Sequence, residues 1–293
     1  MLTPFRLEEP RSVQEASILL ARYGESARIY AGGTELLLAM KESLVRPSAL
    51  INLKNIPGLN HIKVENGVVR LGALATHRKL EESQILQDYF PALVEMEHHV
   101  ANVRVREAGT LGGNLCFAEP HSDPAALLMA LGARLVARKG ESAREIAIEN
   151  FITGAFETSL GPDEILSEIL LPLPAARSAA AYLKLGYLER PTVGVALSMT
   201  LTDGAVSDAR IGVGSAGPQP KRVEEAEAQL RGRGLKECAA AIDGAGKIAA
   251  RAAEAISDLH GPADYKEHLI EVLLRRLFKS VSERLNQRRK GHA

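Results

Sequence analysis

Two glycine-rich segments constrain this chain more than any other feature of its sequence. Residues 31–36 read AGGTEL, and residues 109–114 read GTLGGN. Glycine has no Cβ atom, so its backbone can adopt positive φ and approach a ligand closely. Successive N–H groups of such a loop, with a helix after it, can converge on an anion such as a phosphate. Hydrogen bonds to a charged group contribute about 1.5–3 kcal/mol each, so two such loops around one pyrophosphate could hold a dinucleotide firmly.

Neither segment matches a common nucleotide motif. The first is not a GxGxxG, because no third glycine follows at the required spacing, and it lacks the lysine of a P-loop, which argues against ATP or GTP chemistry. A single Gly-Gly pair is more often a turn than a ligand site. Together the two segments indicate a ligand site more strongly than either does alone, because hydroxyl and amide side chains lie beside them, at Thr34, Thr110 and Asn114.

The first 57 residues are expected to alternate helices and strands. Ser12 and Glu15 form a capping box for the first helix, and Gly24 ends it. The expected elements are a helix over 12–24, a strand over 28–31, a helix over 35–41 capped by Thr34, and a strand over 49–53. This order predicts a small α/β subdomain.

The middle of the chain, residues 58–175, is expected to form a second α/β subdomain. Asn66-Gly67 between alternating apolar residues at 61–72 is a strong hairpin signal. The other expected elements are a helix capped by Thr76, an amphipathic stretch over 89–102, a helix over 127–133 with a glycine stop, and strands over 134–138 and 164–171.

Residues 176–293 are expected to form a C-terminal α+β domain after a linker over 171–181. Three strands are expected, at Tyr182–Leu188, Val193–Leu201 and Ala209–Val213. The candidate helices are Val223–Leu230, Leu235–Ala241, Lys247–Ala255 and Tyr265–Arg284, followed by a basic, solvated tail over 288–293.

Composition excludes several classes of function. The 293 residues carry a formal net charge of zero, so no long-range field favours nucleic acid or an anionic membrane. Aromatic residues make up only 4% of the chain, which argues against a base-stacking surface. No apolar run reaches the roughly 18 residues of a membrane span, and no signal peptide begins the chain. We therefore expect a cytoplasmic protein.

The reactive side chains point to neither a metal site nor an acid–base catalyst. Cys116 and Cys238 are far apart, belong to no CxxC pair, and are expected to be buried as small apolar residues. The sequence has no HExxH or GxSxG motif. The adjacent pair His98-His99 cannot chelate one ion together. His77 is expected on the surface, and Glu81-Glu82 on an exposed helix face. His121, beside Asp123, is the remaining candidate.

Five stretches resemble the FAD-binding subunit of the molybdenum hydroxylases, the family of carbon monoxide, xanthine and nicotinate dehydrogenases. They are AGGTELLLAMK at 31–41, GALATHRKLEES at 72–83, the segment 106–133, YLKLGYLERPTVGVALSMTL at 182–201 and ADYKEHLIEVLLRRL at 263–277. The resemblance implies a vanillyl-alcohol-oxidase-type (PCMH-type) fold, in which two α/β subdomains grip an extended FAD and a C-terminal α+β domain has a three-stranded antiparallel sheet. It places the pyrophosphate on Ala31, Gly32, Gly33, Thr34, Glu35 and Leu36, and on Thr110, Leu111, Gly112, Gly113 and Asn114.

Four further residues match cofactor positions of that family. Asp123 would accept hydrogen bonds from hydroxyls of the flavin chain; read without the resemblance, it is a helix N-cap before Pro124. Lys184 would stabilise negative charge that develops on the reduced ring; without the resemblance it is a solvated strand residue. Val100 and Leu166 would pack around the cofactor, or are simply core. Relatives often carry an acidic residue where this chain reads Arg190-Pro191-Thr192, which leaves the shielding of the ring open.

The function that the resemblance implies is electron transfer. A large partner subunit would hydroxylate the substrate at a molybdenum–pterin cofactor, and a small partner would carry two [2Fe–2S] clusters, in a dimer of heterotrimers. FAD on this chain would pass the electrons to NAD⁺, oxygen, a quinone or another acceptor, without a protein nucleophile. Two alternatives stay open: a self-sufficient flavin oxidase or reductase acting directly on a small substrate, and a non-enzymatic α/β binding module.

Overall fold

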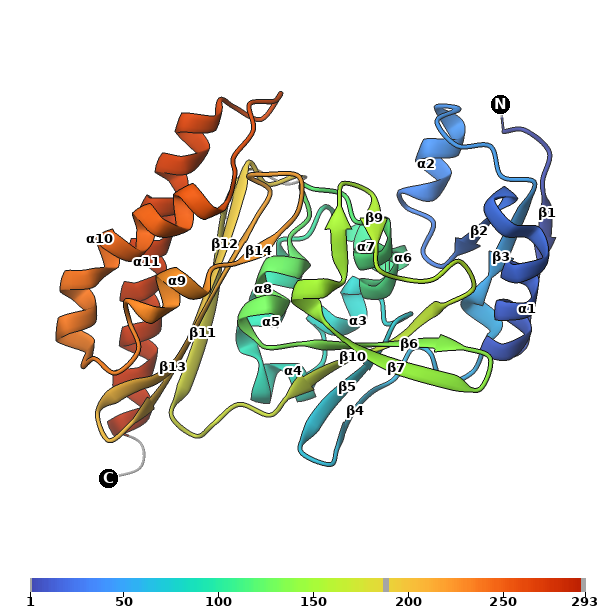
Figure 1. The fold of residues 1–293 in the computed structure, drawn as a ribbon. Coiled ribbons are helices and arrows are strands. Elements are labelled where there is room, and N and C mark those ends of the chain that lie inside the picture. The colour runs from blue at the N-terminus through green and yellow to red at the C-terminus, as the bar shows by residue number, and fades with distance from the viewer. Residues whose placement is uncertain (1, 187–189, 291–293) are drawn as a thin grey trace.

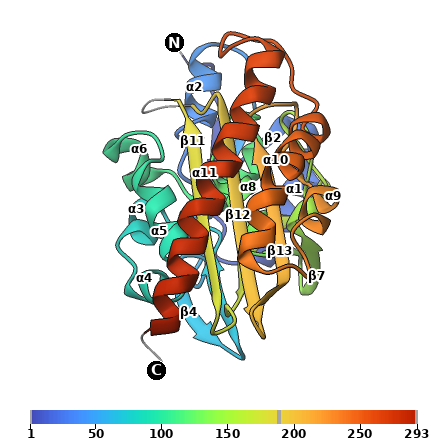
Figure 2. The ribbon, with the colours of Figure 1, turned by 90° about the vertical axis from the view of Figure 1, so that its left-hand side faces the viewer.

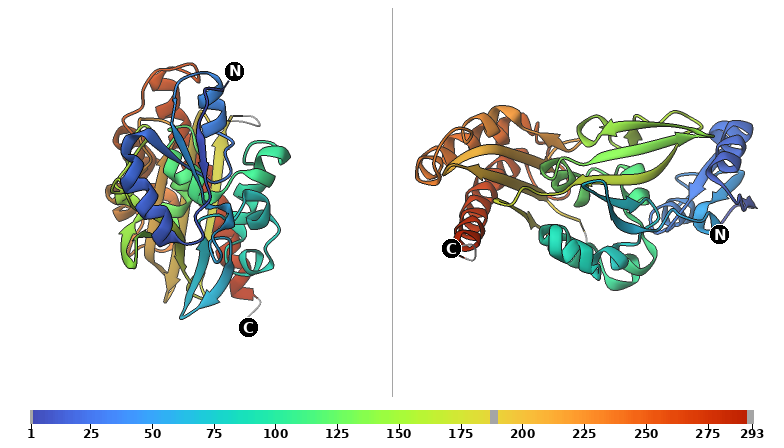
Figure 3. Two further views of the ribbon diagram at one scale, coloured as in Figure 1. Left: turned by 90° about the vertical axis from the view of Figure 1, so that its right-hand side faces the viewer. Right: turned by 90° about the horizontal axis from the view of Figure 1, so that it is seen from below.

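The computed structural model describes residues 2–186 and 190–290. Three main sheets follow one another along an elongated molecule, with the N-terminus at one end and the last helices at the other (Figures 1 and 3). Each sheet has its own buried apolar cluster. In the described part of the chain, no helix is both long and apolar enough to cross a membrane.

The first sheet is parallel, in the order β1-β3-β2, with helix α1 packed on β3. The Ser12 hydroxyl accepts a hydrogen bond from the Glu15 N–H (3.1 Å) and Gly24 ends the helix with φ 55°, as predicted. The Glu15 carboxylate, however, accepts from the Arg11 N–H and not from Ser12. The elements are β1 (Arg6–Glu8), which the sequence did not predict, α1 (Val13–Tyr23), β2 (Ala27–Tyr30), α2 (Leu36–Lys41) and β3 (Ala49–Asn52).

The second sheet is antiparallel, in the order β4-β5-β10-β6-β7. The predicted hairpin is confirmed: Asn66 and Gly67 both have positive φ, which a two-residue turn of this kind needs. β10 lies at the centre and pairs with β5, although nearly 100 residues separate them (Arg70 pairs with Leu170). The strands are β4 (Ile62–Glu65), β5 (Val68–Gly72), β6 (Arg134–Lys139), β7 (Ser142–Ala147), the small pair β8 (Ile152–Gly154) and β9 (Glu157–Thr158), and β10 (Ile165–Pro172).

Six short helices lie between β5 and β6 in the chain, and two of them, α5 and α8, contact the C-terminal sheet. Every residue of α8 is buried, because this helix lies between the second subdomain and the C-terminal sheet (Figures 1 and 2). The Thr76 hydroxyl caps α3 as predicted, accepting from the Lys79 N–H. The helices are α3 (His77–Glu81), α4 (Gln84–Tyr89), α5 (Pro91–His98), α6 (Val103–Ala108), α7 (Leu111–Phe117) and α8 (Pro124–Ala130).

The C-terminal sheet is antiparallel and has a fourth, two-residue strand beyond the predicted three. Helices α10 and α11 cover its outer face (Figure 2). Two helices were predicted where α10 is continuous, because buried Ile242, Ala245 and Ala249 keep helical spacing across the glycines and pack beside α11. The elements are β11 (Ser178–Leu185), β12 (Val193–Thr202), β13 (Ala205–Gly214), β14 (Lys221–Arg222), α9 (Glu224–Ala228), α10 (Leu235–Ala252) and α11 (Ala263–Lys290).

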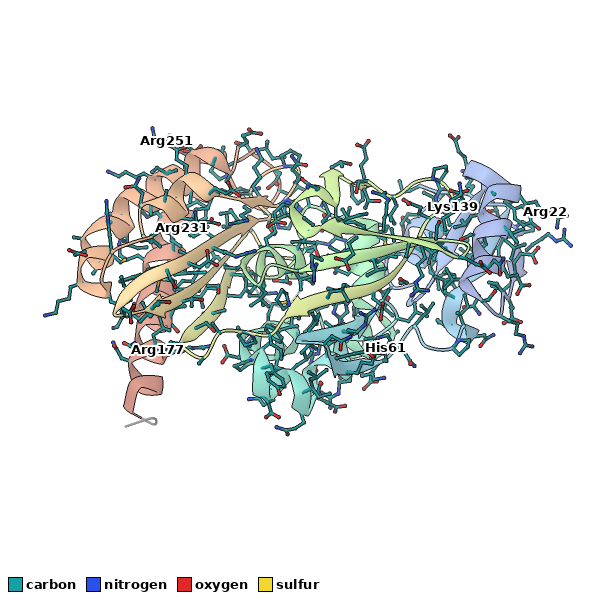
Figure 4. All side chains as sticks on the ribbon, turned by 60° about the horizontal axis from the view of Figure 1, so that its bottom comes forward. Arg22, His61, Lys139, Arg177, Arg231 and Arg251 are labelled. Carbon is teal, nitrogen blue, oxygen red and sulfur yellow. The ribbon has the colours of Figure 1, made fainter. Side chains whose placement is uncertain are left out.

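Some predicted segments fall partly outside the described residues. The end of the strand predicted over Tyr182–Leu188 does so, as do residues 291–293 of the predicted tail, whereas α11 extends through Lys290. The linker predicted over 171–181 is shorter, since β10 ends at Pro172 and β11 begins at Ser178. The domain boundaries at 57/58 and 175/176 stay a prediction. The labelled basic side chains are spread over the whole length of the molecule (Figure 4).

Candidate cofactor-binding site

The first glycine segment forms the turn between β2 and α2. Gly33 has φ 78°, a left-handed conformation that favours glycine. The prediction that Thr34 caps α2 is wrong. Glu35 occupies the cap position and makes no capping hydrogen bond. Among the described residues, none accepts a hydrogen bond from the backbone N–H groups of residues 32–35.

The second glycine segment joins α6 to α7, and its amides are already used within the protein. The Leu111 N–H donates to Ala75 O (3.0 Å) and the Gly112 N–H to Ala73 O (2.9 Å). Thr110 caps α7, because its hydroxyl accepts from the Gly113 N–H (3.0 Å). The expectation that both segments offer backbone N–H groups thus fits the first segment and not the second.

The two segments contact each other. A Cβ atom added at Gly32 would lie 2.7 Å from the Gly109 Cα atom and even closer to the Ala108 carbonyl oxygen. One added at Gly113 would lie 3.8 Å from the Ala31 Cβ atom. Gly112 packs on Ala73, because a Cβ atom added at Gly112 would lie 2.6 Å from the Ala73 Cβ atom. The second segment therefore acts as a packed platform that holds the first in place.

Asp123 and Lys184 form a buried ion pair at the contact between the second and third sheets. The Lys184 Nζ atom donates to Asp123 Oδ2 (2.9 Å) and to the His99 carbonyl (2.9 Å), and the Tyr182 hydroxyl donates to Asp123 Oδ1 (2.7 Å). Side-chain exposure is 4% for Asp123 and 11% for Lys184. Asp123 is the N-cap residue of α8 and Pro124 begins the helix, as predicted, but the Asp123 side chain makes no capping hydrogen bond. The solvated-strand alternative for Lys184 is wrong.

Burial and charge act on the Asp123 carboxyl in opposite directions. Burial raises its pKa, and the nearby Lys184 ammonium and Tyr182 hydroxyl lower it. Burial likewise raises the pKa of Tyr182, helped by the Asp123 carboxylate, which keeps that hydroxyl a donor. The pair can present oriented donors and acceptors to a polar ligand without carrying a net charge.

Three further predicted site residues make their contacts within the protein: Asn114, Val100 and Leu166. The Asn114 side-chain oxygen accepts from the Ser122 hydroxyl (2.6 Å), which fixes the amide. Val100 and Leu166 are 6% and 3% exposed and belong to the apolar core of the second subdomain. Both are core residues in this structure, and their contact with a cofactor stays a proposal.

Arg190 connects the first glycine segment to the rest of the site. Its guanidinium lies 3.2 Å from a Glu35 carboxylate oxygen and 2.9 Å from one of Glu119. Glu119 also approaches His121, whose other ring nitrogen lies 3.0 Å from Asp258 Oδ2. A chain of ionisable side chains therefore runs from the first glycine segment to the C-terminal domain, and His121 is a member of it.

Three predictions about reactive side chains are wrong. His77 is 2% exposed and not on the surface; its Nδ1 atom lies 2.7 Å from Glu97 Oε2. The Glu81 side chain is 8% exposed, because it pairs with Arg78, His98 and Arg106, so only Glu82 of that pair is exposed. Cys116 is exposed, since α7 turns its Leu111 and Leu115 face inward, whereas Cys238 is buried as predicted.

Sequence reasoning missed two residues of the site. Tyr182 could have been found, because it stands two positions before Lys184 and so lies on the same face of β11. No local signal marks Glu97, which meets His77 only through the packing of α5 on α3. Two surface hollows, of about 640 and 390 Å³, lie between α10 and α11 and beside His98, and neither is lined by a glycine segment.

Comparison with known families covers nearly the whole chain. The family described as the FAD binding domain in molybdopterin dehydrogenase matches residues 3–174, and the CO dehydrogenase flavoprotein C-terminal domain matches residues 188–281. The carbon monoxide dehydrogenase medium chain of Afipia carboxidovorans is 33% identical over 96% of this chain and 97% of its own. The nicotine 6-hydroxylase medium subunit of Paenarthrobacter nicotinovorans is 30% identical over 97% of this chain and 99% of its own.

Solved structures agree with these matches. A carbon monoxide dehydrogenase from Hydrogenophaga pseudoflava, in a form that lacks the Mo-pyranopterin moiety, superposes with a TM-score of 0.93 at 33% identity, over 97% of this chain and 99% of that one. Quinoline 2-oxidoreductase from Pseudomonas putida 86 superposes with a TM-score of 0.89 at 27% identity, over the same shares of the two chains. This chain therefore belongs to the FAD-binding medium subunits of the molybdenum hydroxylases, a family of oxidoreductase components, and has the FAD-binding fold with an appended C-terminal domain that the resemblance implied.

Proposed function

We propose that this chain is the electron-transfer subunit of a molybdenum-containing hydroxylase or dehydrogenase, in which FAD takes electrons from iron–sulfur clusters on a partner and gives them to an external acceptor. The observation that carries the proposal is the contact between the two glycine segments, beside backbone N–H groups that have no acceptor in the described protein.

The donor set fits a diphosphate. The amides of residues 32–35 would point at its oxygens, while Gly109 and Gly113 pack against that turn. Thr110, Leu111 and Gly112 would support the site through the hydrogen bonds that fix the second segment. A side chain at position 32 would fill the space that the turn needs. Asn114, with its amide fixed by Ser122, would donate from the other side.

The remaining residues would place the rest of the cofactor. Asp123 would accept hydrogen bonds from hydroxyl groups of the flavin chain, and Lys184 would set a positive charge near the ring. The attraction and the hydrogen bond between the two side chains offset part of the desolvation cost of burying both charges. Leu36, Val100 and Leu166 would supply apolar contacts.

Bound FAD would supply the chemistry, since a flavin accepts two electrons and releases them singly or in pairs. The protein's own residues would bind, orient and shield it. Neither an acid–base pair nor a nucleophile is required of this chain, which agrees with the use of Asp123, His77 and Glu81 in buried ion pairs.

The partners are proposed from the relatives, which are named as medium chains or medium subunits. We expect a large subunit with a molybdenum–pterin cofactor and a small subunit with [2Fe–2S] clusters, in a dimer of heterotrimers in the cytoplasm. The substrate of the complex would then be chosen by the large subunit, and not by this chain.

Affinity purification of the tagged chain from its native cells tests the proposal. We expect FAD equimolar with the chain, two co-purifying subunits, and molybdenum and iron in the eluate. A chain that neither retains FAD nor binds it when it is added would refute the proposal. A chain that holds FAD, copurifies with no partner and turns over a small substrate would instead be the self-sufficient flavoenzyme.

A further inference from the structure

His77 lies where the two glycine segments meet. Its backbone N–H donates to Gly109 O (3.0 Å). A Cβ atom added at Gly109 would lie 3.2 Å from the His77 Cδ2 atom and 3.4 Å from the Thr34 hydroxyl oxygen. The Nε2 atom is bonded to Cδ2, so that edge of the imidazole and the Thr34 hydroxyl stand side by side against the same glycine.

Glu97 holds this imidazole in one orientation. The Glu97 side chain is fully buried, and its Oε2 atom lies 2.7 Å from His77 Nδ1. A carboxylate at that distance keeps a proton on Nδ1 and leaves Nε2 for another partner. Among the described residues, no hydrogen-bond partner of Nε2 is found.

The Glu97 carboxylate has few polar contacts. Its Oε1 atom is buried and has no hydrogen-bond partner in the described protein, so His77 is the one group that contacts this carboxylate by a hydrogen bond. A buried carboxylate needs a compensating charge. Arg106, the buried cation of α6, is committed to Glu81 and to backbone carbonyls, which leaves His77 as the group placed to supply it.

We propose that His77, oriented by Glu97, is a ligand of the FAD pyrophosphate, with its Nε2–H donating a hydrogen bond to a phosphate oxygen. The inference rests on the proposed function. It adds an anion-binding side chain to a site that otherwise depends on backbone amides. A neutral ring with its proton on Nδ1 would present a lone pair to the phosphate, so binding requires the imidazolium.

Loss of one hydrogen bond to a charged group should weaken FAD binding by about 10- to 100-fold.

The experiment uses the full chain and two probes, FAD and riboflavin, which lacks phosphate. His77→Gln and Glu97→Gln are compared with His268→Gln, the same change at an exposed residue of α11. We expect both site variants to lose FAD affinity while riboflavin affinity stays unchanged, and His268→Gln to behave as wild type. Equal losses for FAD and riboflavin would overturn the proposal, because they would indicate a structural role.

Phosphorus NMR of bound FAD gives a second readout, which reports on the phosphates directly. At saturating FAD, the pyrophosphate resonances of His77→Gln should differ from those of the wild type, whereas those of His268→Gln should coincide with them. Identical resonances in the wild type and His77→Gln would overturn the inference. A wild-type chain that binds no FAD would refute the proposed function itself, whereas intact FAD binding with an unchanged phosphorus spectrum would refute only the role of His77.

Discussion

The contact between the glycine segments makes Gly32→Ala the most informative single change in this protein. The added methyl group would lie 2.7 Å from the Gly109 Cα atom and closer still to the Ala108 carbonyl oxygen. Carbon atoms normally approach to about 3.5–4.0 Å, so the two backbones must separate by about 1 Å. Both neighbours are backbone atoms, so no side chain can rotate away.

The size of the effect follows from two contributions. Overpacking of this kind costs about 1–3 kcal/mol of folding free energy. Displacement of the turn also misplaces its N–H donors, and each hydrogen bond lost to a phosphate costs about 1.5–3 kcal/mol of binding free energy. We therefore expect FAD affinity to fall by at least about tenfold.

Gly244→Ala is the matched control. It lies inside α10, and its added Cβ atom would meet no atom within 4 Å. Alanine in a helix interior is worth about 0.5–1 kcal/mol over glycine, so this variant should gain slightly in stability and keep its FAD affinity. Urea unfolding and titration of flavin fluorescence measure the two quantities. A Gly32→Ala chain that binds FAD as tightly as Gly244→Ala would refute the role given to the contact.

Three further predictions concern the ion pairs. Burial raises the pKa of the Asp258 carboxyl, but the Lys266 ammonium and the other donors around it lower that pKa to about 2. The contribution of this carboxylate to folding stability is therefore present above its ordinary pKa and is lost as the pH falls. In urea unfolding, the stability advantage of wild type over Asp258→Asn should shrink by about 2 kcal/mol between pH 5 and pH 2, and a constant difference would contradict this. Asp123→Asn leaves buried Lys184 without its counter-charge, so in the same assay it should lower folding stability by about 3 kcal/mol, and it should also lower FAD affinity. A stable variant that retains FAD would count against the site. Arg190→Ala removes an arginine whose side chain is 39% exposed and should change stability by less than about 1 kcal/mol, but stopped-flow should show faster FAD release.

Local signals were enough to predict much of the fold. Ser12, Gly24 and Thr76 end or begin helices where predicted, and Asn66-Gly67 turns a hairpin, because each of these effects depends only on neighbours in the sequence. The pairing of β10 with β5 and the two-residue strand β14 depend on packing between distant segments, and no pattern within either segment specifies them.

The same difference between local and long-range effects applies to the site. The glycine pairs could be found in the sequence, because a position that must lack a side chain is occupied by glycine. The partners of Asp123 and His77 were not, because they come from β11 and α5 and meet only in the folded protein. His77 looked like a surface residue next to a helix cap, and its burial results from the packing of α5 on α3.

Hydrogen exchange of backbone amides, with and without FAD, tests the central claim most directly. The amides of residues 32–35 lack acceptors within the described protein, whereas those of Leu111 and Gly112 are already hydrogen-bonded. FAD should therefore slow exchange strongly at residues 32–35 and change it little at Leu111 and Gly112. If FAD binds while exchange at residues 32–35 stays fast, the first glycine segment does not hold the pyrophosphate.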